Sequence, residues 1–227
     1  MKVFYSPEYC VPGSRYETLQ KSGWIAASLE RRPIGGVEVV ARLDAPDRVA
    51  LDALAKEAPV TVIAAGTIQC GHWLMAFAGE VYAVELAYER AHRVASSSIV
   101  DTVLLPHAEP RLLPALRDGS VRFPAPGDAL GVVQTSSSPT LLRAVDLALK
   151  GAEVELVELR VAEGLAGRGL ATLWGSQHDV MAALDLAREG FAEGRSQGAT
   201  TALIANADPE VARALRAGTR FFKEFRG

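Results

Sequence analysis

Apolar residues recur at helical spacing in both halves of the chain. In the second half they occupy positions i, i+3, i+4, i+7 and i+11 of one segment, namely Val180, Ala183, Leu184, Ala187 and Phe191. In the first half a matching stripe consists of Val84, Ala87, Tyr88 and Ala91. Residues at this spacing lie on one face of an α-helix, so both segments are predicted to be helices with one buried face.

Short apolar runs before and after these two helices predict β-strands. In the first half the runs are Val37–Val40, Val60–Ala65, Trp73–Ala78 and Val103–Leu105. In the second half they are Leu130–Val133, an alternating segment that begins at Val154, then Leu170–Trp174 and Thr201–Ile204. Further helices are expected to begin at Pro46, at Pro139 with Ser138 as N-cap, and at Pro209. Each half therefore has the predicted order βαββαβ, with a short helix at the end.

The two halves also share sequence. Three segments of the first half recur about 96 residues later, a distance too long for an ordinary solenoid unit. The pairs are Asp52–Lys56 with Asp146–Lys150, Gly79–Ala87 with Gly175–Ala183, and Glu109–Arg111 with Asp208–Glu210. The predicted fold class is α/β (α+β), with two tandem βαββαβ domains that have ferredoxin-like sheets.

The repeat sets the expected domain boundaries. Residues 1–34 have no counterpart in the second half and are expected to form an N-terminal extension, with a helix over Tyr16–Leu29. The first domain is expected at 35–119, the linker at 120–127 and the second domain at 128–227. A tandem pair brings two similar but independently variable surfaces into one subunit, which favours assembly over a single buried active site.

Composition excludes several classes of function. The net charge is −3 with 22% charged residues, which gives no basic footprint for nucleic acid. No apolar run reaches membrane-spanning length, and the first residues do not resemble a signal peptide. The two cysteines, Cys10 and Cys70, do not make a disulfide framework and fit a reducing cytosol.

Several segments of the second half together resemble one known family. They are Ala129–Thr135, Ala144–Lys150, Val154–Val157 and Gly169–Gly175. Their order resembles that of a bacterial microcompartment (BMC) shell domain, and a weaker version occurs in the first half, so the resemblance covers roughly residues 36 to 217. One departure is Gln134, where the family pattern has Glu. The whole chain is similar to the tandem-domain shell proteins, which form trimers that imitate a hexamer.

The resemblance implies a structural role, not an enzymatic one. A protein of this type is expected in the cytoplasm, in the microcompartment shell, where it assembles with itself as a homotrimer and with other shell proteins. In that family the loop between the second and third strands surrounds the threefold axis and forms a pore for small metabolites. The positions that carry this role over are Gly66, Thr67, Ile68, Gln69, Cys70, Gly71, Glu163, Gly164, Leu165, Ala166 and Gly167.

The resemblance also assigns a role to two lysines. Lys56 and Lys150 occupy the same place after the first helix of each repeat. In the family this lysine lies at the rim of the tile and contacts the next tile, with its aliphatic stem covering apolar surface. The alternative is a solvated lysine at a helix C-terminus, where the helix dipole favours a positive charge.

Cys70 leaves two interpretations open. The segment Thr67–His72 resembles the pore loop of a tandem shell protein that binds an iron–sulfur cluster. Three Cys70 thiols on a threefold axis would form a soft-metal site, and the chain would then be a shell subunit with an iron–sulfur cluster for electron transfer. Cys70 here lies one residue before the glycine, not two, and a free thiol that points into the fold is the other interpretation. Catalysis by Cys70 with His72 lacks a third orienting group.

A different function remains open at the level of fold. Tandem ferredoxin-like domains share the βαββαβ order, and a small-molecule-binding regulatory protein of this kind would hold its ligand between the domains. Such a protein is expected to be a stable dimer that forms no trimers or sheets.

Overall fold

The computed structural model describes residues 34–40, 46–68, 72–118, 128–161, 165, 168–194 and 198–217. The helix expected over Tyr16–Leu29, the linker expected at 120–127 and the two cysteines lie outside the described residues. In the described part of the chain, each repeat contains the predicted strands and helices.

The first repeat runs from β1 to α5. Its elements are β1 (Ile34–Val40), α3 (Pro46–Glu57), β2 (Thr61–Ile68), β3 (His72–Ala78), α4 (Val81–Ala95), the short 3₁₀ turn η3 (Ser96–Ser98), β4 (Ile99–Leu105) and α5 (Leu112–Asp118). The second repeat has the elements β5 (Ala129–Thr135), α6 (Ser138–Gly151), β6 (Glu155–Val161), β7 (Gly169–Gly175), α7 (Gln177–Glu193), β8 (Thr200–Ile204) and α8 (Pro209–Ala217). The predicted βαββαβ order and the α/β fold class are confirmed.

The described strands form two antiparallel sheets of the same topology, with orders β2-β3-β1-β4 and β6-β7-β5-β8. Their registers also correspond. Gly35 of β1 pairs with Phe77 and Leu104, and Gly131 of β5 pairs with Leu173 and Leu203. The two repeats can therefore be aligned strand by strand, and positions on β4 correspond to positions on β8.

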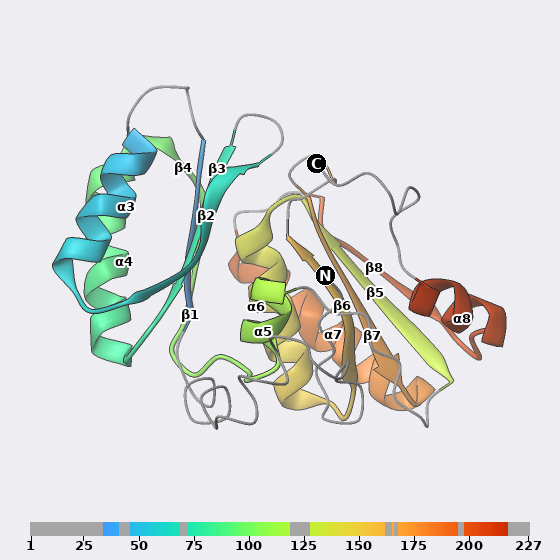
Figure 1. Ribbon diagram of the computed structural model, residues 1–227. Helices are drawn as coiled ribbons and strands as arrows, with labels where there is room; N and C mark the ends of the chain where they lie inside the picture. The colour runs from blue at the N-terminus through green and yellow to red at the C-terminus, as the bar shows by residue number, and fades with distance from the viewer. Residues whose placement is uncertain are drawn as a thin grey trace, which may run out of the picture.

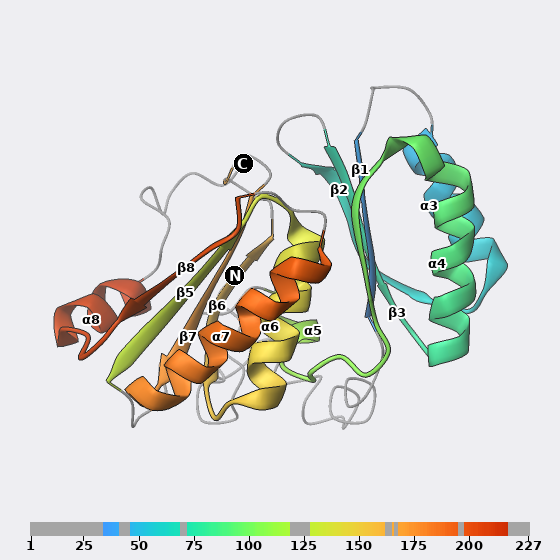
Figure 2. The ribbon, with the colours of Figure 1, turned by 180° about the vertical axis from the view of Figure 1, so that it is seen from behind.

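The layers of the molecule stack in one direction (Figure 1). In repeat one, α3 and α4 cover one face of the first sheet, and the opposite face of that sheet meets the helices of repeat two. There α6 packs on β4 and β1, while α6 and α7 also cover their own sheet. The view from behind shows the same order, with α8 on the far face of the second sheet (Figure 2). The repeats are thus packed head to tail.

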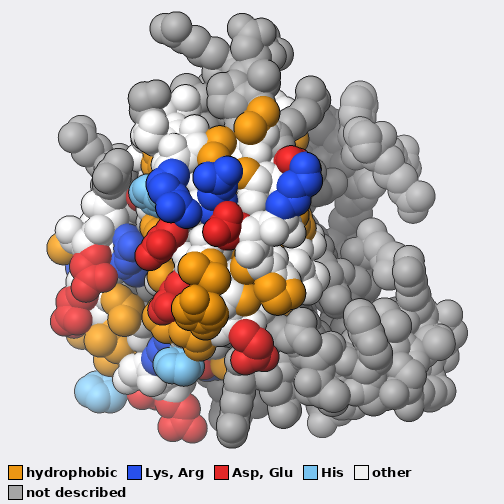
Figure 3. Space-filling view, turned by 90° about the vertical axis from the view of Figure 1, so that its left-hand side faces the viewer, with side chains coloured by type: hydrophobic (Ala, Val, Ile, Leu, Met, Phe, Trp, Pro, Cys, Tyr) orange, Lys and Arg blue, Asp and Glu red, His pale blue; other side chains and the backbone are white. Residues whose placement is uncertain are grey.

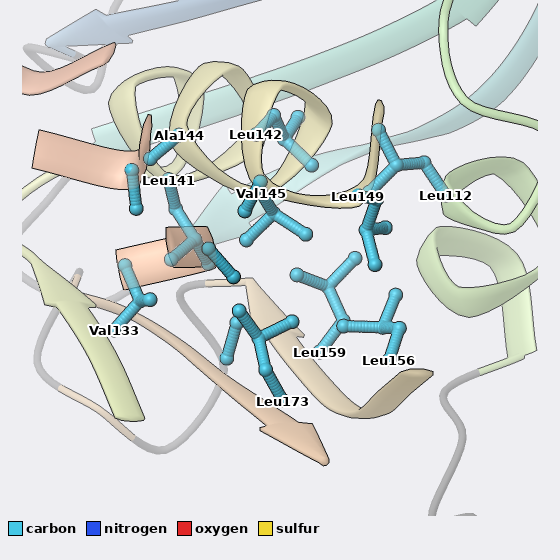
Figure 4. Close-up of a cluster of buried hydrophobic side chains, with 14 of the residues drawn as sticks. Leu112, Val133, Leu141, Leu142, Ala144, Val145, Leu149, Leu156, Leu159 and Leu173 are labelled. Carbon is cyan, nitrogen blue, oxygen red and sulfur yellow. The ribbon is translucent and has the colours of Figure 1, made fainter. Parts of the chain in front are cut away.

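The core follows these layers. One cluster lies between α3, α4 and the first sheet and includes Leu54, Met75, Phe77 and Val84. A second cluster fills repeat two and continues into repeat one, where it includes Val103 and Leu105 of β4. Figure 4 shows part of it, with Leu112 of α5 beside Leu149 of α6. The contact between the repeats is therefore part of the hydrophobic core.

Two boundaries differ from the prediction. Strand β2 continues beyond Gly66 and pairs with β3 as far as Ile68 opposite His72, so Gly66, Thr67 and Ile68 belong to a strand and not to a loop. The N-cap of α6 is Ser137, not Ser138, because Ser137 has extended backbone angles and its side chain accepts the N–H of Thr140. Each serine of the run Ser136–Ser138 could cap a helix with its hydroxyl, so the backbone conformation at Ser137 decides which one does.

Candidate assembly interface and pore loops

The apolar part of the contact between the repeats comes from alternate residues of β4. Along this strand Asp101, Val103 and Leu105 are buried, while the residues between them are less so. Val103 and Leu105 belong to the same cluster as Leu142 and Leu149 of α6. Period-two burial is what a strand shows when one face is covered, and here the cover is the helix of the next repeat.

A carboxylate lies within this contact. Asp101 is only 2% exposed, and its Oδ2 accepts hydrogen bonds from the hydroxyl of Ser137, from the Thr140 hydroxyl at 2.6 Å and from the Thr140 N–H at 3.2 Å. Its Oδ1 accepts the N–H of Thr102 at 2.9 Å. Ser137 and Thr140 stand at the N-terminus of α6, where N–H groups lack intrahelical partners and the helix dipole favours negative charge. A residue of repeat one therefore caps a helix of repeat two.

The opposite end of α6 is held by an arginine. The guanidinium of Arg111, which precedes α5, donates to the backbone carbonyls of Val154 at 2.7 Å and Leu149 at 3.1 Å. It also donates to Glu109 at 2.6 Å. A cation near the C-terminus of a helix is favoured by the dipole. Repeat one thus presents an acid to the start of α6 and a base to its end.

A third polar contact lies along the side of α6. The backbone N–H of Glu109 donates to Oδ1 of Asp146 at 2.7 Å, and Lys150 donates to Oδ2 of the same carboxylate at 2.6 Å. The aligned pair in repeat one, Asp52 and Lys56, forms the same 2.6 Å ion pair on α3. The side chain of Asp146 is 5% exposed and that of Asp52 is 59% exposed. The difference arises because repeat one covers α6, whereas no part of the described chain covers this face of α3.

The same contrast holds for the strands. Asp101, Val103 and Leu105 of β4 are buried under α6. In β8, by contrast, every described residue except Thr201 is exposed. Ile204, which aligns with the buried Leu105 of β4, is 42% exposed. One chain therefore contains one closed contact of helix on strand, together with an open helix face on α3 and an open strand face on β8.

The candidate pore loops connect the second and third strands of each sheet. In repeat one, residues 69–71, including Gln69, Cys70 and Gly71, lie outside the described residues between Ile68 and His72. In repeat two, β6 ends at Val161 and β7 begins at Gly169; Leu165 is described, and its carbonyl accepts the N–H of Arg168 at 3.1 Å. Glu163, Gly164, Ala166 and Gly167 lie outside the described residues. The ends of β2 and β6 lie at the same, upper edge of the molecule in Figure 1.

Known proteins with this arrangement identify the family. The family model of the BMC domain matches this chain twice, over residues 45–108 and 129–207, which is more than half of its length. The chain belongs to the BMC-domain family. The bacterial microcompartment shell protein PduT of Citrobacter freundii is 31% identical over 142 residues, which span 63% of this chain and 76% of that protein.

Solved structures of BMC proteins agree with the fold. A microcompartment protein from Desulfitobacterium hafniense DCB has a TM-score of 0.67 at 27% identity, over 80% of this chain and 98% of its own. The fused permuted hexameric shell protein MSM0275 of the RMM microcompartment has a TM-score of 0.53 at 22% identity, over 71% of this chain and 82% of its own. The double-ringed trimeric shell protein MSM0271 has a TM-score of 0.53 at 18% identity, over 70% of this chain and 81% of its own. These last two likenesses concern the fold alone.

The polar residues of the BMC–BMC contact were not predicted as functional. Asp146 and the segment Glu109–Arg111 marked the repeat, without a role, and Asp101 was not singled out. One signal was present, because a charged residue at an inward position of the apolar run Ile99–Leu105 requires a buried partner. The partners lie 36 to 39 positions further along the chain, so their identity needs the fold.

The predicted edge contacts of Lys56 and Lys150 and the predicted metal site at Cys70 stay predictions. The ion pairs of Lys56 and Lys150 are internal, and contacts with a neighbouring tile lie beyond a single chain. In the described residues, no three His, Cys, Asp or Glu side chains lie together in an arrangement that could hold a metal ion. None of the helices in the described part of the chain is long and apolar enough to cross a membrane.

Proposed function

We propose that this chain is a structural subunit of a bacterial microcompartment shell and that three copies form a pseudohexagonal tile. The observation that carries the proposal is the head-to-tail contact between its two BMC domains, which leaves one helix face and one strand face open. An interface whose two sides differ generates a closed ring when the rotation between units closes, and a filament when it does not. The shell proteins among its relatives support the ring.

The open faces have the composition of an interface. Figure 3 views the side of repeat one that carries α3 and α4, and hydrophobic side chains gather in its middle, with basic and acidic side chains around them. The exposed large hydrophobic residues of these two helices include Val49 at 52% and Tyr82 at 72%. On the other open face is Ile204 of β8, which aligns with the buried Leu105 of β4. Apolar centres with charged rims are typical of association surfaces.

In this tile the two hairpin loops of each chain alternate around the axis. Backbone N–H groups and small side chains of such loops select permeants by size and hydrogen bonding. The loops bounded by β2–β3 and by β6–β7 differ in length, so the opening has threefold symmetry and not sixfold symmetry. Its permeants are small metabolites, and tiles meet one another through the rim near Lys56 and Lys150. The work of the protein is to enclose a compartment, in the cytoplasm and in its shell, without a catalytic step.

Native mass spectrometry tests the assembly. The expected mass is that of three chains, 24.2 kDa each, at micromolar concentration. A stable dimer that never forms trimers would overturn the tile and would favour a tandem ferredoxin-like regulatory protein instead. The family and the relatives named above do not favour that alternative.

A cluster at Cys70 is a separate proposal within the same tile. Cys70 lies between the end of β2 and the start of β3, and three copies of this hairpin around an axis would bring three thiolates together, the ligands that iron–sulfur clusters take. Anaerobic reconstitution with iron and sulfide is expected to give wild-type protein a visible absorption band that Cys70→Ser lacks. Identical spectra from the two proteins would remove the cluster and leave the shell role intact.

A further inference from the structure

The short helix α5 packs on both repeats at once. It contacts β2 of its own sheet and β6 of the second sheet. Its residues Leu112 and Leu113 are buried, and they belong to the same apolar cluster as Leu156 of β6. Figure 4 shows Leu112 beside Leu149 of α6. The helix that ends repeat one therefore seals the edge between the two BMC domains.

Helix α8 begins in the same way and lies at the same place on its own sheet. The turn before each helix contains a hydrogen bond from an N–H to the carbonyl three residues earlier, at 3.0 Å before α5 and at 2.9 Å before α8. Val211 and Leu215 of α8 pack on a cluster that contains Val157, which occupies the register shift of β6. Ile63, which packs on the cluster of α5, occupies the same register shift of β2. The two helices are therefore equivalent.

The two helices differ in what covers their outer side. Ala115 of α5 is only 2% exposed, because repeat two lies against the helix. The aligned residue of α8, Ala214, is exposed. Helix α8 thus has one side on its own sheet and an outer side that no part of the described chain covers.

The surface on which α5 docks also has an open counterpart. In repeat two this surface consists of the end of α6 and the edge strand β6, and in repeat one of the end of α3 and the edge strand β2. Three aligned pairs are buried in repeat two and exposed in repeat one, namely Leu149 and Ala55, Leu156 and Val62, and Leu159 and Ala65. Val62, at 40% exposed, is the largest of the three open residues. One chain therefore carries an uncovered helix and an uncovered edge of the kinds that meet at α5.

We propose that α8 of one chain docks on the open edge of β2 in the next chain, as α5 docks on β6 within one chain. This inference rests on the proposed tile and adds a second element to its contact between chains, beside α3 on β8. A second copy is the occupant that the chain itself specifies, because each chain already contains the same contact between equivalent elements. In the assembled tile Ala214 and Val62 are buried together.

One polar contact of α5 is absent from α8. Arg111 donates to two carbonyls, one at the end of α6 and one just before β6. The aligned residue of α8 is Glu210, which forms an ion pair with Arg213 of its own helix. The two carbonyls at the aligned positions of the next chain belong to Ala55 and Val60. An arginine at position 210 is therefore expected to find two acceptors there, and the natural glutamate does not.

Ala214→Glu tests the docking by loss of assembly. A buried carboxylate without a partner opposes the contact. Sedimentation velocity over a dilution series in 0.1 M salt is expected to show trimers that dissociate at a concentration at least about tenfold higher than wild type. Met181→Glu is the matched control, since Met181 is also exposed and its aligned residue, Glu85, is already a glutamate. This control is expected to stay within about threefold of wild type.

Glu210→Arg tests the docking by gain of assembly. Its guanidinium can donate to both carbonyls at once, so its trimers are expected to dissociate at a concentration at least about tenfold lower than wild type. Glu210→Lys adds the same charge without the planar fork and is expected to stay within about threefold of wild type.

The outcomes separate this inference from the proposed function. A wild-type protein that forms no trimer overturns the tile itself. A wild-type trimer that Ala214→Glu leaves intact, or that Glu210→Arg strengthens no more than Glu210→Lys, overturns the docking of α8 alone. Circular dichroism of each dilute variant is expected to match wild type, because Ala214 and Glu210 are exposed in the single chain.

Discussion

At the scale of single residues, the two repeats use the same side chains in different surroundings. Asp146 and Asp52 each hold a lysine four positions later at 2.6 Å. Asp146 is buried and also accepts the backbone N–H of Glu109, whereas Asp52 is exposed. Exposed helical ion pairs contribute only tenths of a kcal/mol, while a buried acceptor that satisfies a backbone donor contributes more. Burial by the neighbouring repeat therefore decides the energetic weight of a repeated aspartate.

This contrast gives a prediction with a built-in control. Asp146→Ala is expected to lower the free energy of unfolding by about 1–3 kcal/mol, because the Glu109 N–H is left buried without its acceptor. Asp52→Ala is expected to change it by at most about 0.5 kcal/mol. Urea unfolding of both variants, at concentrations where the protein is monomeric, measures the difference. Equal effects would mean that the contact between the repeats does not bury Asp146 in solution.

At the scale of elements, the sequence was sufficient for the type and order of helices and strands, because apolar periodicity is a local property. It was insufficient for the end of β2. Gly66 interrupts the apolar run and was interpreted as the start of a loop, yet pairing with β3 continues to Ile68. The apolar stripe of α7 was predicted from spacing, but Phe191 at its end is only partly buried. The end of β2 depends on backbone pairing with β3, which the apolar pattern of one segment does not reveal, and the polar contacts depend on residues that are distant in sequence.

The packing of α7 on α6 requires a small residue at one position. A Cβ on Gly190 would lie 2.8 Å from the Cα of Ala144 and 3.1 Å from its backbone nitrogen. Backbone atoms of a packed helix cannot move aside at low energy, so Gly190→Ala is expected to destabilise the protein by about 1–3 kcal/mol.

Thermal unfolding measures this effect, with Gly66→Ala as the matched control. A Cβ on Gly66 of β2 meets no atom within 4 Å, so that variant is expected to be as stable as wild type or slightly more stable. If Gly190→Ala unfolded at the wild-type temperature, this result would contradict the close packing of α7 on α6 at Gly190 and Ala144.

At the scale of the whole molecule, one chain carries both sides of the same kind of interface, a helix face on repeat one and a strand face on repeat two. The helix face of repeat two is buried on the strand face of repeat one, and the remaining helix and strand faces are open at opposite ends of the stack (Figure 1). Repetition of the same contact between chains satisfies both open faces only in a closed ring or an endless filament. Membership of the BMC-domain family supports the ring.

Single-particle electron microscopy of the wild-type oligomer tests this account most directly, because it locates the rotation axis. The account predicts a threefold plate of three chains in which α3 of one chain lies on β8 of the next. The hairpin ends at Ile68, His72, Val161 and Gly169 are expected to stand around the centre. A twofold particle, or a ring that places these hairpin ends at its outer rim, would contradict it.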